Sequence, residues 1–505
     1  MRIQRLGFHG LKKWLSGVMG WSEVMVGGWN MLGKGLVRFV LWGGICSVLL
    51  GGCSTKNEVA TKRSIEDRRG REQGKTGDTE ETGKKRETGE TGEVGETEKV
   101  ESYGKKGPKP WSVAITVSAK LEEIKKAALG VNVFAADMWT KLPKRLEGQN
   151  AFISPWSISM AFGMAYAGAR KDTEKEMRRV LHFDLGQKRQ HAAFGAMTKE
   201  LSAAMSTKNY ELVAANSLWP DKKLKVLPSY VKLLERRYGV GVRSLNYAGS
   251  AKRNKEIING WIKYRTKGKI PKLLTEADLP PLTRLVLVNT IYFKGTWEKK
   301  FKKRRTQKEA FHLPDGQTMQ VPMMSKTDSY QMLSKPTFDL LRLPYKGKRI
   351  VMDIILPKDK TGLAQVEKEL VANKMDLGKT GVIPFERVWV KLPRFKMRTR
   401  VKLGNTLKAL GLDKSMNLQK ANFSGIAKPT KEGLAIDDAI HEAMVEVTEE
   451  GTVAAAATAL MAKGAGAPSK PKEFHVDHPF LFQLRDNVSG VVLFVGRVVK
   501  PKVIN

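Results

Sequence analysis

Residues 285–293 read Leu-Val-Leu-Val-Asn-Thr-Ile-Tyr-Phe, an apolar run broken only by a short polar pair. Runs of this kind are typical of strands buried on both faces of a sheet. Residues 212–219 and 350–356 have the same character, whereas 388–392 and 444–447 alternate as half-buried strands do. The sequence therefore predicts a large β-sheet core around residues 285–293.

Helices are predicted ahead of most of these strands. Apolar residues recur at helical spacing across 121–142 and stop at Pro143. Ser154-Pro155 provides an N-cap and a first-turn proline for a second helix, and 173–176 reads as the capping box of a third. Because the helices come first and most strands later, the α+β class is favoured over a regular βαβ array.

The N-terminal region reads as a leader. Lys34 and Arg38 precede a short apolar run that closes at Leu50-Gly51-Gly52-Cys53. This ending resembles a bacterial lipoprotein signal, in which the cysteine is lipidated and becomes the new N-terminus. We therefore predict a signal peptide over residues 1–52, with residue 31 as an alternative start, and lipidation at Cys53. The protein is then exported and lipid-anchored at the cell envelope or extracellular.

The following stretch, residues 53–112, is polar and repetitive and contains few large apolar residues. It cannot bury enough surface to offset its conformational entropy, so a disordered tether is predicted there. Residues 113–505 form the expected folded domain. The whole chain carries a formal net charge of +38, which favours contact with polyanions such as nucleic acid, acidic polysaccharide or anionic lipid, with a basic but otherwise inert surface as the alternative.

The sequence contains few of the motifs that are typical of enzymes. The chain has neither a Gly-x-Ser-x-Gly elbow nor a phosphate-binding Gly-x-x-x-x-Gly-Lys-Ser/Thr loop. His441-Glu442 does not begin a zinc motif, because Val445 occupies the place of the second histidine. Both cysteines, Cys46 and Cys53, lie in the first apolar stretch. We expect no catalytic residues, no metal site and no cofactor.

Several segments occur in the order typical of one family. They include Asn-Ala-Phe-Ile-Ser-Pro-Trp-Ser-Ile-Ser at 150–159, Leu-Val-Asn-Thr-Ile-Tyr-Phe-Lys-Gly-Thr-Trp at 287–297, Ala-Asn-Phe-Ser-Gly-Ile at 421–426 and Asp-His-Pro-Phe-Leu-Phe at 477–482. Together they resemble the serpins, protease inhibitors with helices packed around three β-sheets and an exposed reactive centre loop. The resemblance covers about 370 residues and begins near Ser118.

The resemblance implies a mechanism for the small residues that follow Glu449. A target protease would cleave the loop, and its hinge would then insert into the central sheet as a new strand. Small, uncharged side chains suit that burial, whereas Arg or Pro would oppose it. The implied hinge residues are Glu449, Glu450, Gly451, Thr452, Val453, Ala454, Ala455, Ala456, Ala457 and Thr458.

The resemblance also implies residues that control opening of the sheet. Ser154, Ser157, Asn289 and His441 correspond to the polar shutter beneath the central strands. Trp297, with Glu449, corresponds to the breach, the end of the sheet where the hinge first enters. Ordinary core packing is the alternative explanation for these residues.

The target protease follows from the bond that is cleaved. The family register places that bond at Ala465-Gly466, which suits an elastase-like or subtilisin-like serine protease, with a cysteine protease as a further option. A shift of two residues gives Lys463-Gly464 and a trypsin-like target. The basic run 299–305 suggests binding of an acidic polysaccharide, with a solvated charged surface as the alternative.

Two other functions remain open at this stage. One is a non-inhibitory serpin that acts as a binding or chaperone-like protein, and the other is a surface-tethered polyanion binder. Val453, Thr448 and Asp437 depart from the usual family residues. Since Val453 is β-branched and favours a strand, it does not oppose insertion. We expect a monomeric protease inhibitor.

Overall fold

The chain divides into two units, Met1–Thr97 and Glu98–Asn505. The computed structural model describes residues 36–41, 44–49, 119–205, 209–375, 382–451 and 470–502. In the first unit, β1 (Leu36–Leu41) and β2 (Gly44–Leu49) pair antiparallel. Among the helices of the described ranges, none has the length and apolar character needed to cross a membrane. The predicted signal peptide and tether lie largely outside these ranges.

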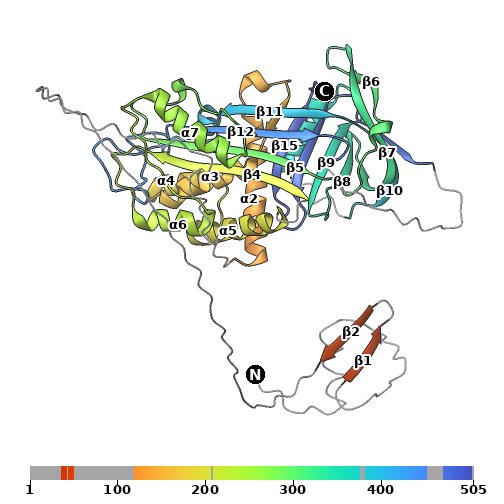
Figure 1. Ribbon diagram of the computed structural model, residues 1–505, viewed down its shortest axis with the longest axis horizontal. Coiled ribbons are helices and arrows are strands. Elements are labelled where there is room, and N and C mark those ends of the chain that lie inside the picture. The colour runs from red at the N-terminus through yellow and green to blue at the C-terminus, as the bar shows by residue number, and fades with distance from the viewer. Residues whose placement is uncertain are drawn as a thin grey trace, which may run out of the picture. The chain divides into compact units, whose positions relative to one another are not determined.

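The second unit is built from helices followed mainly by strands, as expected (Figure 1). Its α-helices are α2 (Leu121–Thr140), α3 (Pro155–Gly168), α4 (Lys171–Val180), α5 (Gly186–Met205), α6 (Pro228–Tyr238), α7 (Ala251–Arg265), α8 (Leu363–Ala372) and α9 (Gly404–Ala409). The predicted start of α3 is confirmed, because Ser154 Oγ accepts a hydrogen bond from the Ser157 amide and Pro155 is the first helical residue.

The strands of this unit form two separate sheets. The smaller is ordered β11 (Phe395–Lys402), β12 (Asp438–Val447), β5 (Leu285–Gly295), β4 (Tyr210–Pro220). The larger is ordered β13 (Lys472–His475), β10 (Phe385–Pro393), β7 (Thr318–Ser334), β8 (Phe338–Pro344), β9 (Ile350–Pro357), β14 (Phe480–Asp486), β15 (Val492–Val498), β3 (Ala151–Ile153), with β6 (Gln307–His312) beside β7.

Strand β5 has a hydrophobic core on each face, as its apolar run predicts. Leu287 and Ile291 belong to the main core, whereas Val286 and Val288 belong to a second core made with α7 and the chain after it. Figure 1 shows α3 to α6 on one side of the four-stranded sheet and α7 on the other. Strand β5 is thus fixed at the centre of the sheet.

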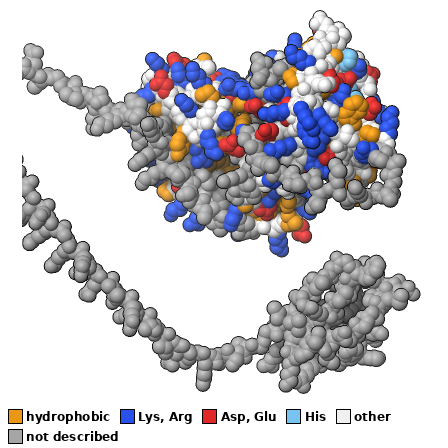
Figure 2. Space-filling view, turned by 45° about the vertical axis from the view of Figure 1, so that its right-hand side comes forward, with side chains coloured by type: hydrophobic (Ala, Val, Ile, Leu, Met, Phe, Trp, Pro, Cys, Tyr) orange, Lys and Arg blue, Asp and Glu red, His pale blue; other side chains and the backbone are white. Residues whose placement is uncertain are grey.

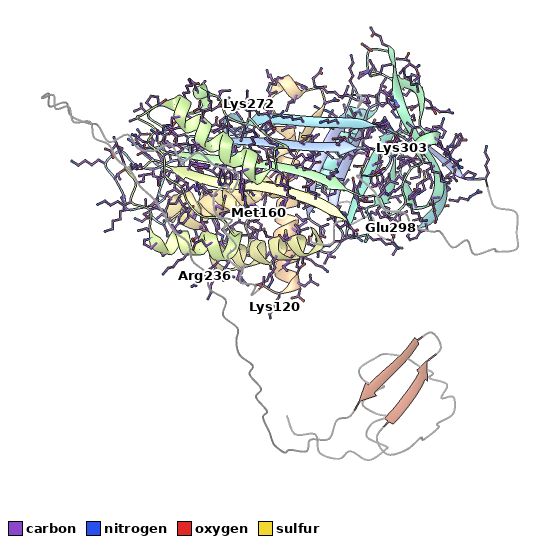
Figure 3. All side chains as sticks on the ribbon, in the orientation of Figure 1. Lys120, Met160, Arg236, Lys272, Glu298 and Lys303 are labelled. Atoms are coloured by element: carbon purple, nitrogen blue, oxygen red, sulfur yellow. The ribbon has the colours of Figure 1, made fainter. Side chains whose placement is uncertain are left out.

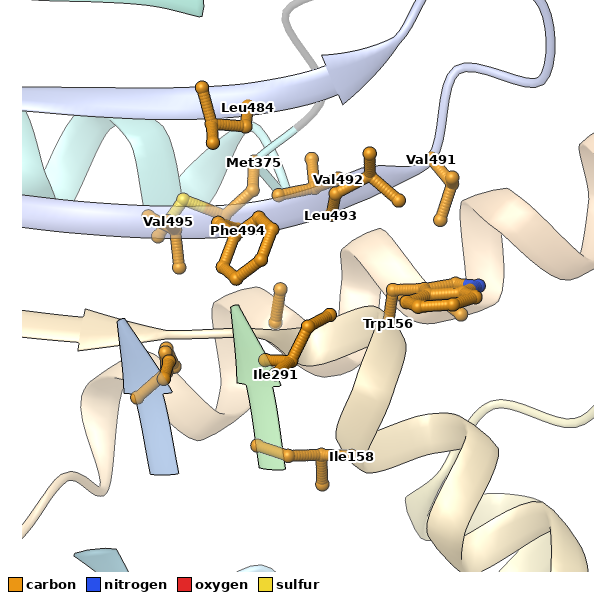
Figure 4. Packing of buried hydrophobic residues seen from close by; sticks show 14 of the residues in the cluster. Trp156, Ile158, Ile291, Met375, Leu484, Val491, Val492, Leu493, Phe494 and Val495 are labelled. Atoms are coloured by element: carbon orange, nitrogen blue, oxygen red, sulfur yellow. The ribbon is translucent and has the colours of Figure 1, made fainter. Parts of the chain in front are cut away.

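The main core continues from β5 to the larger sheet. Phe152 of β3 stacks on Phe494 of β15 with ring centroids 5.0 Å apart. Phe494 in turn contacts Phe293 of β5 at 6.1 Å. In the close view of Figure 4, Trp156 and the start of α3 lie beside Ile291 and the β15 side chains. The first turn of α3 is therefore held directly beneath the four-stranded sheet.

Three local predictions need correction. The capping box at 173–176 is wrong, because α4 begins at Lys171 and Thr173 Oγ1 instead accepts from the Asn422 amide. The half-buried pattern at 444–447 is also wrong in its first half, since Met444 is buried on a strand with a core on each side. Residues 212–214 are only partly buried, because β4 is the edge strand of its sheet. The patterns at 350–356 and 388–392 are confirmed.

Candidate functional site

The centre of the four-stranded sheet is a parallel pair of strands. Strand β12 pairs with β5 from Asp438↔Val286 to Val445↔Phe293, so that His441 lies opposite Asn289. On the other side of β5, Asn216 of β4 is also opposite Asn289. Three polar side chains therefore form one row across three strands, on the face that packs against α3.

The start of α3 completes a buried polar cluster with this row. Asn289 Nδ2 donates to the carbonyl oxygen of Ser157 at 2.7 Å, to Ser157 Oγ at 2.6 Å and to Asn216 Oδ1 at 2.5 Å. Ser157 Oγ donates to Asn216 Oδ1 at 3.1 Å. Ser154 Oγ donates to the carbonyl oxygen of Leu493 at 2.5 Å. We name Ser154, Ser157, Asn216, Asn289 and His441 the polar cluster.

His441 is held in one neutral tautomer within the cluster. Its Nε2 accepts a hydrogen bond from the Ser154 amide at 3.1 Å, so the proton must reside on Nδ1, which contacts Asn289 Oδ1. Complete burial, which disfavours the charged form, lowers the pKa of His441 to about 3. Protonation of His441 would place a hydrogen on Nε2, which could then no longer accept the hydrogen bond from the Ser154 amide. The observed geometry therefore requires a neutral ring.

The end of the same sheet is closed by a tight turn after β12. Trp297 Nε1 donates to the carbonyl oxygen of Thr448 at 2.9 Å, and the Trp297 amide donates to that of Glu450 at 3.1 Å. The Phe301 amide donates to the carbonyl oxygen of Glu449 at 2.8 Å. The Trp297 ring stacks on Tyr345 with centroids 4.3 Å apart. The chain that follows β5 therefore holds the turn at residues 448–451 in place through hydrogen bonds.

The Glu449 side chain adds a buried polar contact to this turn. It is 4% exposed, and its Oε1 accepts from Thr306 Oγ1 at 2.8 Å. Its Oε2 lies 3.5 Å from Nε of Arg394, which connects β10 to β11. A carboxylate that is buried without such partners would be strongly destabilising. Glu449 thus joins the turn to the residues that immediately precede β6 and β11.

Gly451 fits the turn because it has no side chain. Its φ is +72°, in the left-handed region, and an added Cβ would lie 2.3 Å from the Trp297 nitrogen and 2.4 Å from the Gly295 oxygen. The isolated bridge Thr448↔Gly451 is antiparallel, so the chain reverses direction here. The chain therefore leaves Gly451 at the same end of the sheet at which β5 and β12 end.

The structure brings together every predicted site residue that it describes, in two groups. Ser154, Ser157, Asn289 and His441 meet in the polar cluster, and Trp297, Glu449, Glu450 and Gly451 meet at the turn. The remaining predicted residues lie outside the described ranges: Cys53, the hinge from Thr452 to Thr458, Lys463, Gly464, Ala465 and Gly466. Their predicted roles stay predictions.

Asn216 is a member of the polar cluster that sequence reasoning did not assign. It accepts from both Ser157 and Asn289. The signal that could have found it is an amide within an apolar strand, in the strand expected next to β5. Its exact position opposite Asn289 depends on the strand register, which one sequence does not provide. Within the described ranges, no group of His, Cys, Asp and Glu side chains is arranged to hold a metal ion.

Comparison with known proteins accounts for this arrangement. A family model described as serpin (serine protease inhibitor) matches residues 129–501. The leukocyte elastase inhibitor of Homo sapiens is 35% identical over 376 residues, covering 73% of this chain and 97% of the relative. Antithrombin-III of Mus musculus is 34% identical over 379 residues, covering 73% and 80%.

A solved structure of native protease nexin-1 with heparin agrees with these relatives. It has 31% sequence identity and a TM-score of 0.66, and the match covers 75% of this chain and all of that one. The chain therefore belongs to the serpin family and has the α+β serpin fold.

Proposed function

We propose that this serpin inhibits a serine-type endopeptidase as a suicide substrate. The serine hydroxyl of the protease adds to the carbonyl carbon of Ala465, the Ala465–Gly466 bond breaks, and Gly466 leaves with a free amino group. Ala465 remains bound to the protease as an ester. The freed hinge then inserts between β5 and β12 and carries the protease with it.

The observation that carries this proposal is the turn at residues 448–451. Because the turn reverses the chain at the end of β12, a hinge that continues from Gly451 along the sheet runs antiparallel to β12. Strand β5 is parallel to β12, so the hinge would be antiparallel to both neighbours. Insertion replaces one parallel ladder with two antiparallel ladders, which are slightly more stable per residue.

The polar cluster opposes insertion of the hinge while the loop is intact. The contact between Asn289 and His441 joins the two strands that the hinge must separate. The native pair stays closed while the buried hydrogen bonds of the cluster are satisfied, since breaking one of them costs about 1–3 kcal/mol. Loop cleavage would release a strand whose own ladders outweigh that cost.

Covalent complex formation tests the inhibitor proposal. The protein is mixed with an elastase-like and with a trypsin-like serine protease, and the products are separated under denaturing conditions. A complex that resists denaturant with the elastase-like enzyme, together with a released fragment beginning at Gly466, supports the proposal. Cleavage of every molecule without a complex indicates the non-inhibitory alternative. A fragment beginning at Gly464 assigns the reactive bond to Lys463.

We infer that polyanions act on this serpin through the basic run 299–305. Lys303 Nζ lies 4.0 Å from Glu450 Oε1, and the Phe301 amide binds the Glu449 carbonyl oxygen, so the run contacts the turn directly. Figure 3 places Lys303 and Glu298 at the same end of the molecule, and Figure 2 shows Lys and Arg side chains widely spread over one face. A solved structure of a relative, protease nexin-1, contains heparin, which supports polyanion binding without fixing its position.

Heparin chromatography tests this polyanion site. Changing Lys300, Lys302 and Lys303 to Gln should lower the salt concentration needed for elution. A matched triple change of Lys175, Lys188 and Lys199 to Gln removes the same charge elsewhere and should have less effect. Equal effects of the two triple variants would contradict a specific site at 299–305 and would indicate a general attraction between the basic protein and heparin.

We further propose that a lipid on Cys53 holds a monomeric inhibitor at a membrane surface, with residues 53–112 as the tether. The lipoprotein-like ending Leu-Gly-Gly-Cys supports this proposal. Membrane association should be lost in Cys53→Ala and retained in Cys46→Ala, measured by fractionation after expression of the full chain. Retention of Cys53→Ala in the membrane fraction would contradict lipid anchoring at this residue.

A further inference from the structure

A second, separate basic feature is a cleft at the edge of the four-stranded sheet. The cleft has a volume of about 720 Å³ and lies between the end of α2, the short 3-10 helix η1 (Lys144–Leu146), β11 and α9. Its lining residues are Lys141, Pro143, Lys144, Arg145, Arg400, Lys402, Asn405 and Thr406. Five of these residues are cationic and none is acidic, so the cleft concentrates positive charge.

One carboxylate offsets part of this charge. Asp278 Oδ2 lies 2.7 Å from Arg400 Nη2, and its Oδ1 lies 2.5 Å from Lys402 Nζ. In the described part of the chain, Lys141, Lys144 and Arg145 form no ion pair. Two further carboxylates act electrostatically on the same residues, Asp438 on Lys402 and Glu442 on Arg400. The five cations of the cleft therefore outnumber the three carboxylates near them, and the positive charge is least compensated at Lys141, Lys144 and Arg145.

Two of the cations are held in place by the backbone around them. Arg400 Nε donates to the carbonyl oxygen of Leu273 at 2.8 Å, and Arg145 Nη2 donates to that of Arg400 at 2.6 Å. Lys402 follows Arg400 by two residues on β11, so their side chains lie on the same face of the strand. Guanidinium groups fixed in this way bind phosphate or sulfate at a lower entropic cost.

The end of helix α2 is a further feature that opposes anion binding. The helix ends at Thr140, and its C-terminal carbonyl groups carry about half a negative charge. Thr406 Oγ1 donates to the carbonyl oxygen of Lys141 and so satisfies one of these groups. Half a charge is smaller than the excess of cations over carboxylates around the cleft.

We propose that this cleft binds a compact polyvalent anion, a ligand that carries two or more phosphate or sulfate groups. The site is distinct from the basic run 299–305 and does not depend on protease inhibition. It differs from a general basic surface because its cations converge on one hollow. Asp278 competes with the ligand for Arg400 and Lys402, so removal of the Asp278 charge should tighten binding.

Isothermal titration calorimetry on the full chain tests the site, with tripolyphosphate as the probe in a chloride buffer of low ionic strength. We expect one ligand per chain. Lys141→Gln and Lys144→Gln should each weaken binding roughly fourfold, the contribution of one unit charge in a solvent-like dielectric. Asp278→Asn should strengthen binding. Loss of folding cannot explain variants that shift affinity in opposite directions.

Lys188→Gln and Lys199→Gln are the matched controls and should leave the affinity unchanged, and Lys300→Gln and Lys303→Gln test for binding at the basic run 299–305 instead. A sulfated disaccharide tested in parallel identifies the source of the anion: tighter binding of tripolyphosphate assigns phosphate, and tighter binding of the disaccharide assigns a sulfated glycan. Absence of binding of both probes at about 1 mM would overturn the proposal. An affinity that depends on Lys300 and Lys303 but not on Lys141 and Lys144 would overturn it as well.

Discussion

Acidification should loosen the pairing between β5 and β12, because His441 must stay neutral there. The pKa of His441 is about 3 in the native state and about 6.5 once the strands separate and the ring reaches water. The open state therefore binds a proton below pH 6.5 that the closed state does not. Stability of the closed pair is fully present above this pH and is lost progressively as the pH falls toward 3.

The size of the effect follows from these two pKa values. Between pH 7 and pH 5 the population of the open state should rise about 25-fold, or by about 2 kcal/mol. Hydrogen exchange followed by mass spectrometry measures this rise at the amides of β5 and β12, after correction for the pH dependence of intrinsic exchange. The increase should be confined to peptides that cover these strands and their immediate partners.

Two variants isolate His441 from other groups that titrate. In His441→Gln the amide can still accept from Ser154 and donate to Asn289, but it cannot take up a proton. In His191→Gln the substituted residue is another buried histidine with a pKa of about 3, on α5 and hydrogen-bonded to Tyr238. The pKa of Glu442, raised by burial, acts in the opposite direction but is common to all three proteins.

The acid-induced rise in exchange at β5 and β12 should disappear in His441→Gln and persist in His191→Gln. The reasoning would be refuted if the wild type and His441→Gln showed the same pH dependence at these amides. It would also be refuted if His191→Gln removed the effect. Either result would place the acid-sensitive group outside the polar cluster.

The remaining predictions concern the turn, the cluster and the hinge. Gly451→Ala should lower the free energy of unfolding by at least about 2 kcal/mol, compared with about 1 kcal/mol for Gly316→Ala, which has a similar φ but open space around it; equal losses in thermal denaturation would contradict the tight fit at the turn. Asn289→Ala should lower the free energy of unfolding by about 2–4 kcal/mol, because it leaves buried hydrogen-bond partners unpaired. A loss of less than about 0.5 kcal/mol in thermal denaturation would show that the polar cluster does not stabilise the fold. Thr452→Arg should turn the inhibitor into a substrate, whereas Thr452→Ser should still inhibit; retained inhibition by the arginine variant would count against burial of the hinge.

Local signals predicted the fold best where the interacting groups are close in sequence. The start of α3 depends on Ser154, Pro155 and Ser157, all within one turn, and it was predicted correctly. Thr173 was misassigned because its partner is Asn422, 249 residues away. The burial of Met444 was missed for a similar reason, since the residues opposite it, Tyr292 and Arg398, come from strands distant in the chain.

The residues of the candidate site could be predicted mainly from the resemblance to serpins. Composition alone shows that the residues after Gly451 are small and suited to burial. The hydrogen bonds of His441 reach Asn289 and Ser154, which are 152 and 287 residues away in the chain. No spacing rule joins such distant residues, and Asn216 was not identified because its position depends on strand register.

A disulfide across β5 and β12 tests the central claim most directly, because insertion requires these strands to separate. Val288 and Ile440 are opposite in the parallel register, and the natural cysteines, Cys46 and Cys53, precede the serpin-family match in the sequence. The double variant Val288→Cys, Ile440→Cys is compared with Ala215→Cys, Thr290→Cys, which joins β4 to β5 and leaves the insertion path free.

The measurement is the yield of covalent protease complex before and after reduction. Loop insertion predicts that the oxidised β5–β12 variant is cleaved as a substrate, that reduction restores trapping, and that the β4–β5 variant traps the protease in both states. Undiminished trapping by the oxidised β5–β12 variant would contradict the account.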